Sequence, residues 1–153
     1  MRLLAIAILL GLFGCTERRS PENGVYVTPR EVFGLQSEIL ELQNGKYRYW
    51  VLGDVGPRVP FERAGRYTVK TDRIHFDEGK DGPDDRLIIS DDEMSRLLRD
   101  DAEEEWKKNG RLNPYGTLTK VSYSFEEMTP STNSNREEWD ALLPKLPTLG
   151  KTE

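Results

Sequence analysis

The stretch EILELQNGKYRYWVL, residues 38–52, predicts a β-hairpin more clearly than any other part of the chain. Two β-prone runs flank Asn44-Gly45, and both residues of a type I′ turn need a positive φ, which Asn and Gly tolerate. The second run alternates between two faces, since successive side chains of a strand point to opposite sides. One face carries Tyr47, Tyr49 and Val51, and the other carries Lys46, Arg48 and Trp50.

Further short alternating runs lie on both sides of this hairpin. We expect strands at 25–28, 65–70, 73–76, 86–90 and 117–125, separated by turns rich in Gly, Pro and Asp. One long helix precedes the last strand. Ser90 and Glu93 fit a capping box at its start, and Asn109-Gly110 fits its end. Apolar residues recur between these signals at helical spacing, at Met94, Leu97, Leu98, Ala102 and Trp106.

These elements predict a mainly β fold of the α+β kind. It is an antiparallel meander or a small closed barrel over residues 24–128, with one amphipathic helix. Residues 129–153 form a polar linker followed by a short helix or tail that Pro144 and Pro147 end. Its apolar residues, Trp139, Leu142 and Leu143, are candidates for docking onto a partner.

Composition excludes several function classes. The chain has 153 residues, a net charge of −5, one Cys and one His. The negative charge argues against nucleic-acid binding, and the single Cys and His exclude an ordinary Cys/His zinc site. A calcium loop starting at Asp77 would place Gly79 and Ile88 at ligand positions, so no metal is expected. His75 is interpreted as a surface residue, and we expect neither a cofactor nor catalysis.

The N-terminus carries a targeting signal. Arg2 precedes an apolar run, Leu3 to Phe13, that is too short to span a membrane and is typical of a secretory signal. Leu12-Phe13-Gly14-Cys15 resembles the lipobox of bacterial lipoproteins, although Phe13 replaces the usual small residue. The resemblance implies removal of residues 1–14, lipidation of Cys15 and a short tether over residues 15–23. Thr16, in place of Asp, implies sorting to the periplasmic face of the outer membrane.

A second resemblance concerns the strands. The segments LELQNGKYRYWV and AGRYTVKTDRIHF resemble the strands of small lipocalin-like barrels found in bacterial envelope lipoproteins. The similarity covers about residues 36–90 and implies an architecture, since one fold hosts many functions.

Four tyrosines are expected to point inward, because they share the strand face of the apolar residues: Tyr47, Tyr49, Tyr67 and Tyr123. They indicate either a filled core with hydroxyl groups at its rim, which we favour, or a partly wet pocket. The sequence therefore predicts a lipid-anchored, non-enzymatic envelope protein that binds a partner protein or a small apolar ligand. An assembly accessory that docks through its tail is the alternative, and an enzyme is a third.

Overall fold

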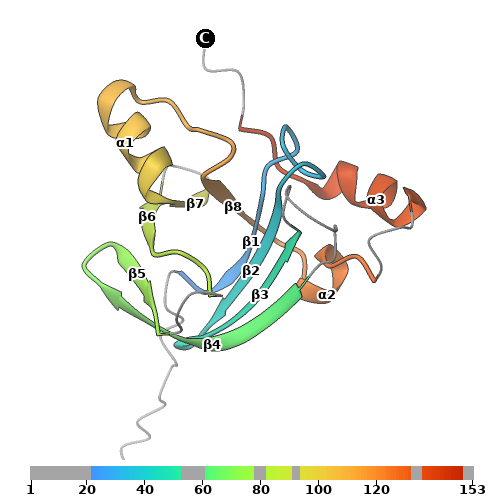
Figure 1. The fold of residues 1–153 in the computed structure, drawn as a ribbon, viewed down its shortest axis with the longest axis horizontal. Coiled ribbons are helices and arrows are strands. Elements are labelled where there is room, and N and C mark those ends of the chain that lie inside the picture. The colour runs from blue at the N-terminus through green and yellow to red at the C-terminus, as the bar shows by residue number, and fades with distance from the viewer. Residues whose placement is uncertain (1–21, 53–60, 78–81, 91–93, 132–135, 150–153) are drawn as a thin grey trace, which may run out of the picture.

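The computed structural model describes residues 22–52, 61–77, 82–90, 94–131 and 136–149. Eight antiparallel strands follow one another in chain order and form a closed barrel, because β8 pairs back onto β1 (Figure 1). The prediction of a mainly β, barrel-forming chain is therefore confirmed. The strands are β1 Gly24–Val27, β2 Ser37–Gln43, β3 Lys46–Leu52, β4 Phe61–Lys70, β5 Arg73–Phe76, β6 Arg86–Ser90, β7 Ser95–Leu98 and β8 Thr117–Val121.

The barrel has two different ends. Its short turns, such as Asn44-Gly45 between β2 and β3, lie at the closed end. The ends of β1, β3, β5 and β7 lie at the other end, which we call the mouth, together with the long described connections 28–36 and 99–116. The predicted hairpin is confirmed, with Gln43 opposite Lys46 and positive φ angles of 50° at Asn44 and 79° at Gly45.

Helices cover two sides of the barrel. Helix α1, Asp100–Asn109, packs on the outside of β6 and β7 as predicted before the last strand, and Gly110 ends it in the left-handed conformation. The C-terminal elements, α2 Phe125–Met128, α3 Arg136–Leu142 and the 3₁₀ turn η1 Leu143–Lys145, lie on another side (Figure 1).

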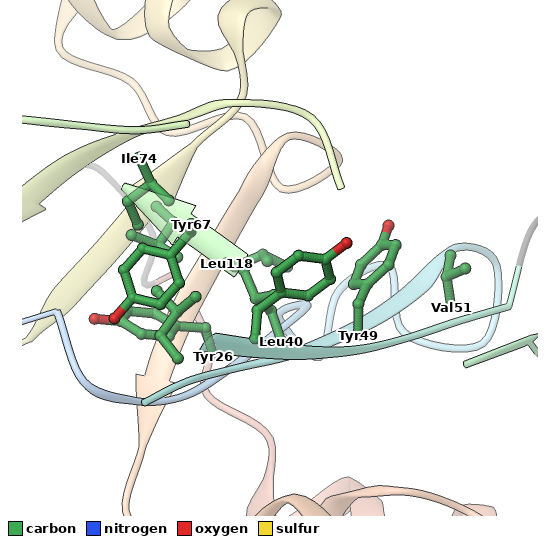
Figure 2. Close-up of a cluster of buried hydrophobic side chains, with 10 residues drawn as sticks. Tyr26, Leu40, Tyr49, Val51, Tyr67, Ile74 and Leu118 are labelled. Carbon is green, nitrogen blue, oxygen red and sulfur yellow. The ribbon is translucent and has the colours of Figure 1, made fainter. Parts of the chain in front are cut away.

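The interior of the barrel is filled by packed aromatic and aliphatic side chains (Figure 2). Tyr47 packs edge-on against Phe76, with 5.1 Å between ring centroids, and Tyr67 contacts the same ring at 6.4 Å. The buried members of this inner core are Tyr26, Leu40, Leu42, Tyr47, Tyr49, Val51, Tyr67, Ile74, Leu97 and Leu118.

A second core lies outside the barrel wall, between β1–β3 and the C-terminal helices. Trp50 is buried on this outer face, and the ring of Trp139 lies 6.2 Å from it. Phe33, from the β1–β2 connection, contacts Trp139 from the other side at 5.2 Å. The strands here are therefore covered on both faces, which explains why Trp50 is apolar although it points away from the interior.

The predicted start of the long helix is wrong. Ser95–Leu98 forms strand β7, which pairs with both β6 and β8 and closes the barrel, and α1 begins only at Asp100. Leu97 points into the inner core, while Leu98 lies under α1. The prediction failed because two adjacent leucines in the sequence are compatible with a helix, while in the structure they are buried on the opposite faces of a strand. The proposed cap residue Glu93 lies outside the described residues, and the observed capping box is Ser124 with Glu127, at α2.

The strand bounds also differ at two places. Strand β4 begins at Phe61, earlier than the predicted Gly65, and its long curve is visible in Figure 1. Strand β8 ends at Val121, so Tyr123 and Phe125 are not strand residues. Phe125 instead lies in α2 and is buried in the outer core.

Candidate functional site

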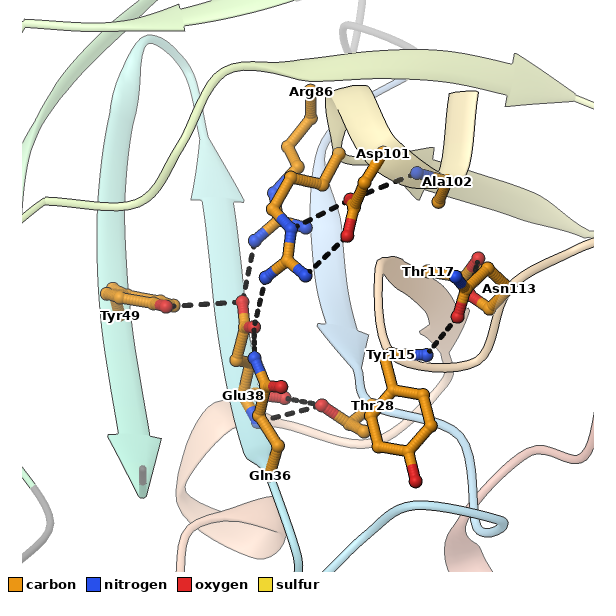
Figure 3. Close-up of polar contacts among 11 residues, drawn as sticks. Thr28, Gln36, Glu38, Tyr49, Arg86, Asp101, Ala102, Asn113, Tyr115 and Thr117 are labelled. Carbon is orange, nitrogen blue, oxygen red and sulfur yellow. Dashed lines mark hydrogen bonds and ion pairs between the residues drawn. The ribbon is translucent and has the colours of Figure 1, made fainter. Parts of the chain in front are cut away.

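A layer of charged side chains runs from the interior near the mouth to the start of α1, and we call it the charged layer: Glu38, Arg86, Arg99 and Asp101 (Figure 3). Strand pairing explains why the first two face inward. Glu38 lies opposite Val51, and Arg86 lies opposite Ile74, and both of these partners belong to the inner core. Glu38 and Arg86 therefore lie inside the barrel wall, while Asp101 belongs to α1 and its side chain is 52% exposed.

Glu38 is the centre of this layer and is fully buried. Its Oε2 atom accepts hydrogen bonds from Nη2 of Arg86 at 2.6 Å and from the hydroxyl of Tyr49 at 3.2 Å. Its Oε1 atom accepts one from Nε2 of Gln36 at 2.9 Å and lies 3.9 Å from Nη1 of Arg99. Burial, reinforced by the negative charge of Glu38, raises the pKa of the Tyr49 phenol above its ordinary value.

Arg99 and Asp101 form the outer part of the layer. The carboxylate of Asp101 accepts from Nε of Arg99 at 2.9 Å and from Nη2 at 2.8 Å, and it also accepts from the backbone N–H of Ala102. The hydrogen bonds from Arg99 hold the pKa of Asp101 below its ordinary value, and the same contact raises the pKa of Arg99. This pair joins the start of α1 to the mouth.

Two hydrogen-bond donors of Arg86 have no acceptor among the described residues. Arg86 is 1% exposed, and its Nε and Nη1 atoms are buried without a hydrogen-bond partner among the described residues. Guanidinium groups stay protonated in proteins, and a buried donor without a partner costs about 1–3 kcal/mol. This arrangement can receive an oxygen acceptor.

Three of the four predicted tyrosines lie inside the barrel, and one does not. Tyr47, Tyr49 and Tyr67 are buried in the inner core, in agreement with their strand parity. The prediction for Tyr123 is wrong, because the strand ends two residues before it. Its side chain is 36% exposed, and Nζ of Lys145 lies 5.2 Å above its ring.

The apolar residues of the predicted docking tail pack against this chain's own barrel. Leu142 is buried in the outer core, and Trp139 and Leu143 are partly buried against it. The end of the tail is joined to the β1–β2 connection, since the backbone N–H of Leu149 donates to Glu31 at 3.0 Å. Docking through these residues stays a prediction, and it would require them to leave this surface.

His75 lies on the outer face of β5 and has a carboxylate partner. Its Nδ1 atom is 2.7 Å from Oδ2 of Asp85, whose other oxygen accepts from the backbone N–H of Phe76 at 3.2 Å. Thr68 lies opposite His75 in the β4–β5 ladder, and the hydrogen bond of the His75 ring is made to Asp85. The pair holds the β5–β6 connection to the barrel.

The end of the predicted tether is part of the barrel. The backbone carbonyl of Glu22 accepts from the Tyr26 hydroxyl at 2.7 Å, and Asn23 exchanges hydrogen bonds with Asn44 in the first hairpin turn. The chain therefore enters the barrel at its closed end. Cys15 and the signal segment 1–14 lie outside the described residues.

The described residues were also searched for metal sites and membrane-spanning helices, and the whole chain was compared with known proteins. They contain no group of three or more His, Cys, Asp or Glu side chains placed to hold a metal ion. None of their helices has the length and apolar character needed to cross a membrane. Comparisons of the chain with family models, curated proteins and solved structures give no match. The two resemblances of the sequence therefore stay predictions.

Sequence reasoning missed Glu38, Arg86 and Arg99, although a signal for two of them was present. Glu38 alternates with Leu40 and Leu42, and Arg86 alternates with Ile88, so strand parity places both charges inside. Arg99 follows the last residue of β7, and it could not be placed while that segment was predicted to be helical.

Proposed function

We propose that this chain is a lipid-anchored protein of the bacterial cell envelope that works by binding and whose binding face is the mouth. The proposal is supported by the position of the two ends. The predicted anchor at Cys15 precedes the closed end by a tether of six residues, 16–21, which reaches about 20 Å when extended. The mouth then faces away from the lipid surface, where a ligand can reach it.

The charged layer is the observation that carries the proposal. Replacing a buried ion pair by apolar residues of similar volume is often neutral or stabilising, so Glu38 and Arg86 are poorly explained as contributors to stability. They lie directly below the long connections of the mouth, above rings that fill the rest of the interior. We therefore place a small ligand at the level of this layer, and not in a deep apolar cavity.

A partner protein on the rim of the mouth is the second candidate. Leu35, in the β1–β2 connection, and Tyr115, in the β7–β8 connection, are each 49% exposed. These two connections are neighbours, because β1 pairs with both β2 and β8. Exposed aromatic side chains such as Tyr115 are enriched at protein interfaces, and Leu35 adds apolar surface beside it.

The test is purification of the full-length protein from native membranes in mild detergent, followed by mass spectrometry of co-purifying proteins and small molecules. We expect a small molecule in stoichiometric amount that Glu38→Gln/Arg86→Met loses and Leu35→Ser/Tyr115→Ser retains. A protein lost only from the Leu35→Ser/Tyr115→Ser variant would favour the second candidate. If neither a small molecule nor a partner protein co-purifies with the wild-type protein, a binding function at the mouth is refuted.

The anchor is tested with Cys15→Ser. The wild-type protein should carry a fatty-acid label and have a mature mass that begins at Cys15, and the variant should do neither. Equal labelling of the two proteins would contradict the proposed anchoring.

A further inference from the structure

Two hydrogen-bond donors of the charged layer have no acceptor among the described residues, and they indicate what the layer binds. The carboxylate of Glu38 accepts hydrogen bonds from Arg86, Tyr49 and Gln36. The carboxylate of Asp101 accepts hydrogen bonds from Arg99 and from the backbone N–H of Ala102. Nε and Nη1 of Arg86, in contrast, are buried donors for which the described residues supply no acceptor.

We propose that Arg86 donates from one of these two atoms to the carboxylate of a small organic acid, since Nε–H and Nη1–H of one guanidinium point in different directions. This inference rests on the proposed function and specifies its ligand. A carboxylate at neutral pH brings acceptor oxygens and no donors, and charge-assisted hydrogen bonds to a guanidinium are stronger than those between neutral groups. A carboxylate therefore supplies the acceptor that Arg86 lacks and adds no further donor.

The charge of the layer selects a monoanion. Arg86 and Arg99 pair with Glu38 and Asp101, and the negative charge of Asp84 also acts on this group. Burial is the main reason that the pKa of Tyr49 is raised, the hydrogen bonds to Asp101 are the main reason that the pKa of Arg99 is raised, and Asp84 raises both further. A ligand with a single negative charge beside Arg86 adds little repulsion to these carboxylates, while a doubly charged phosphate adds a second negative charge close to Glu38. We therefore expect carboxylates to bind better than inorganic phosphate.

The packing of the barrel sets the direction of the ligand. Tyr49 and the rings below it fill the interior on the side of the closed end (Figure 2). The body of the acid must therefore extend from Arg86 toward the mouth, past the inward side chain of Val51, which lies opposite Glu38.

The experiment follows the arginine side chains of the full-length protein in detergent by ¹H–¹⁵N NMR, with sodium butyrate added at constant ionic strength. We expect one Nε–H signal, assigned to Arg86 by its absence in Arg86→Lys, to shift saturably. Butanol and butyramide, which share the chain but lack the charge, should bind at least tenfold more weakly. Sodium phosphate should also bind at least tenfold more weakly.

Two variants separate recognition from folding. Arg86→Met leaves the Glu38 carboxylate buried without its partner, so Glu38→Gln/Arg86→Met, which removes both charges, is the decisive variant. It should fold and lose the saturable binding of butyrate. The control is Arg73→Met, because Arg73 pairs with Asp100 and Glu103 on the outside of the barrel. This variant should bind butyrate as the wild type does.

The outcomes distinguish the two levels of the proposal. The carboxylate site is refuted if the Arg86 signal does not shift, if butanol or butyramide binds equally well, or if the double variant still binds butyrate. Tighter binding of phosphate than of butyrate would refute the proposed preference for a monoanion. In each case, a different small molecule recovered with the native protein would leave the binding function of the mouth intact.

Discussion

Gly65 occupies a place in the barrel wall where a methyl group does not fit. It lies opposite Tyr47 in the β3–β4 ladder, and the phenol ring of Tyr47 crosses it. A Cβ atom at residue 65 would lie 2.7 Å from Cε1 of that ring and 2.9 Å from Cζ. Carbon atoms in van der Waals contact are about 3.5–4.0 Å apart, so the ring would have to move by about 1 Å. Tyr47 is buried and packs against Phe76, which opposes this movement.

Two opposing effects determine how much Gly65→Ala changes the free energy of unfolding. Overpacking of a well-packed core costs about 1–3 kcal/mol. Replacing a strand glycine by alanine returns about 0.5–1 kcal/mol, because the unfolded chain loses freedom. We expect a net loss of about 1–2 kcal/mol, which lowers the melting temperature by roughly 3–8 °C in a domain of this size.

Thermal and urea unfolding of a soluble variant that begins at Thr16 would measure this loss. The matched control is the same substitution in a Tyr47→Leu background, where no ring crosses residue 65. There, Gly65→Ala should be neutral or stabilising. An unchanged midpoint for Gly65→Ala alone, or an equal loss in both backgrounds, would refute the contact between residue 65 and the ring.

Three further predictions use the same assay. Gly45→Val should cost about 1–2 kcal/mol, because the turn needs a left-handed residue at this position; an unchanged midpoint would contradict the turn. Tyr49→Ala should cost about 3–5 kcal/mol if the interior is filled, and a small loss together with stoichiometric binding of an apolar dye would indicate a pocket instead. Burial raises the pKa of Tyr26 and Tyr49, so the folded state keeps protons that unfolded tyrosines lose. Stability should therefore fall as the pH rises above about 10, and phenolate absorbance of these two residues should appear only with unfolding.

The central hairpin and the inner face of β3 were predictable because their signals are local. Asn44-Gly45 specifies its own turn, and the alternation of Tyr47, Tyr49 and Val51 follows from the pleat of a single strand. The Asn109-Gly110 helix end was predictable for the same reason, since it depends on the backbone of one residue.

Strand β7 shows where local reasoning stops. Its four residues contain two adjacent leucines, a pattern that a helix with apolar Ala102 and Trp106 beyond it accommodates equally well. The segment becomes a strand because β6 and β8 each offer it an edge, and the barrel closes only through it. The prediction for Tyr123 failed because the strand ends earlier than its alternation suggests. Phe125 belongs to α2 and is buried in the outer core, so the chain leaves the sheet after Val121.

By itself, the sequence determined that the chain is mainly β, that its N-terminus resembles a lipoprotein leader, and which face of each well-defined strand is apolar. These properties depend on neighbouring residues alone. Only the tertiary structure decided that Trp50 is covered by the C-terminal helices and that Glu38 meets Arg86, which is 48 residues away in the chain. The partner of a buried charge depends on how strands pair and where the barrel closes, and both are set by packing between distant segments.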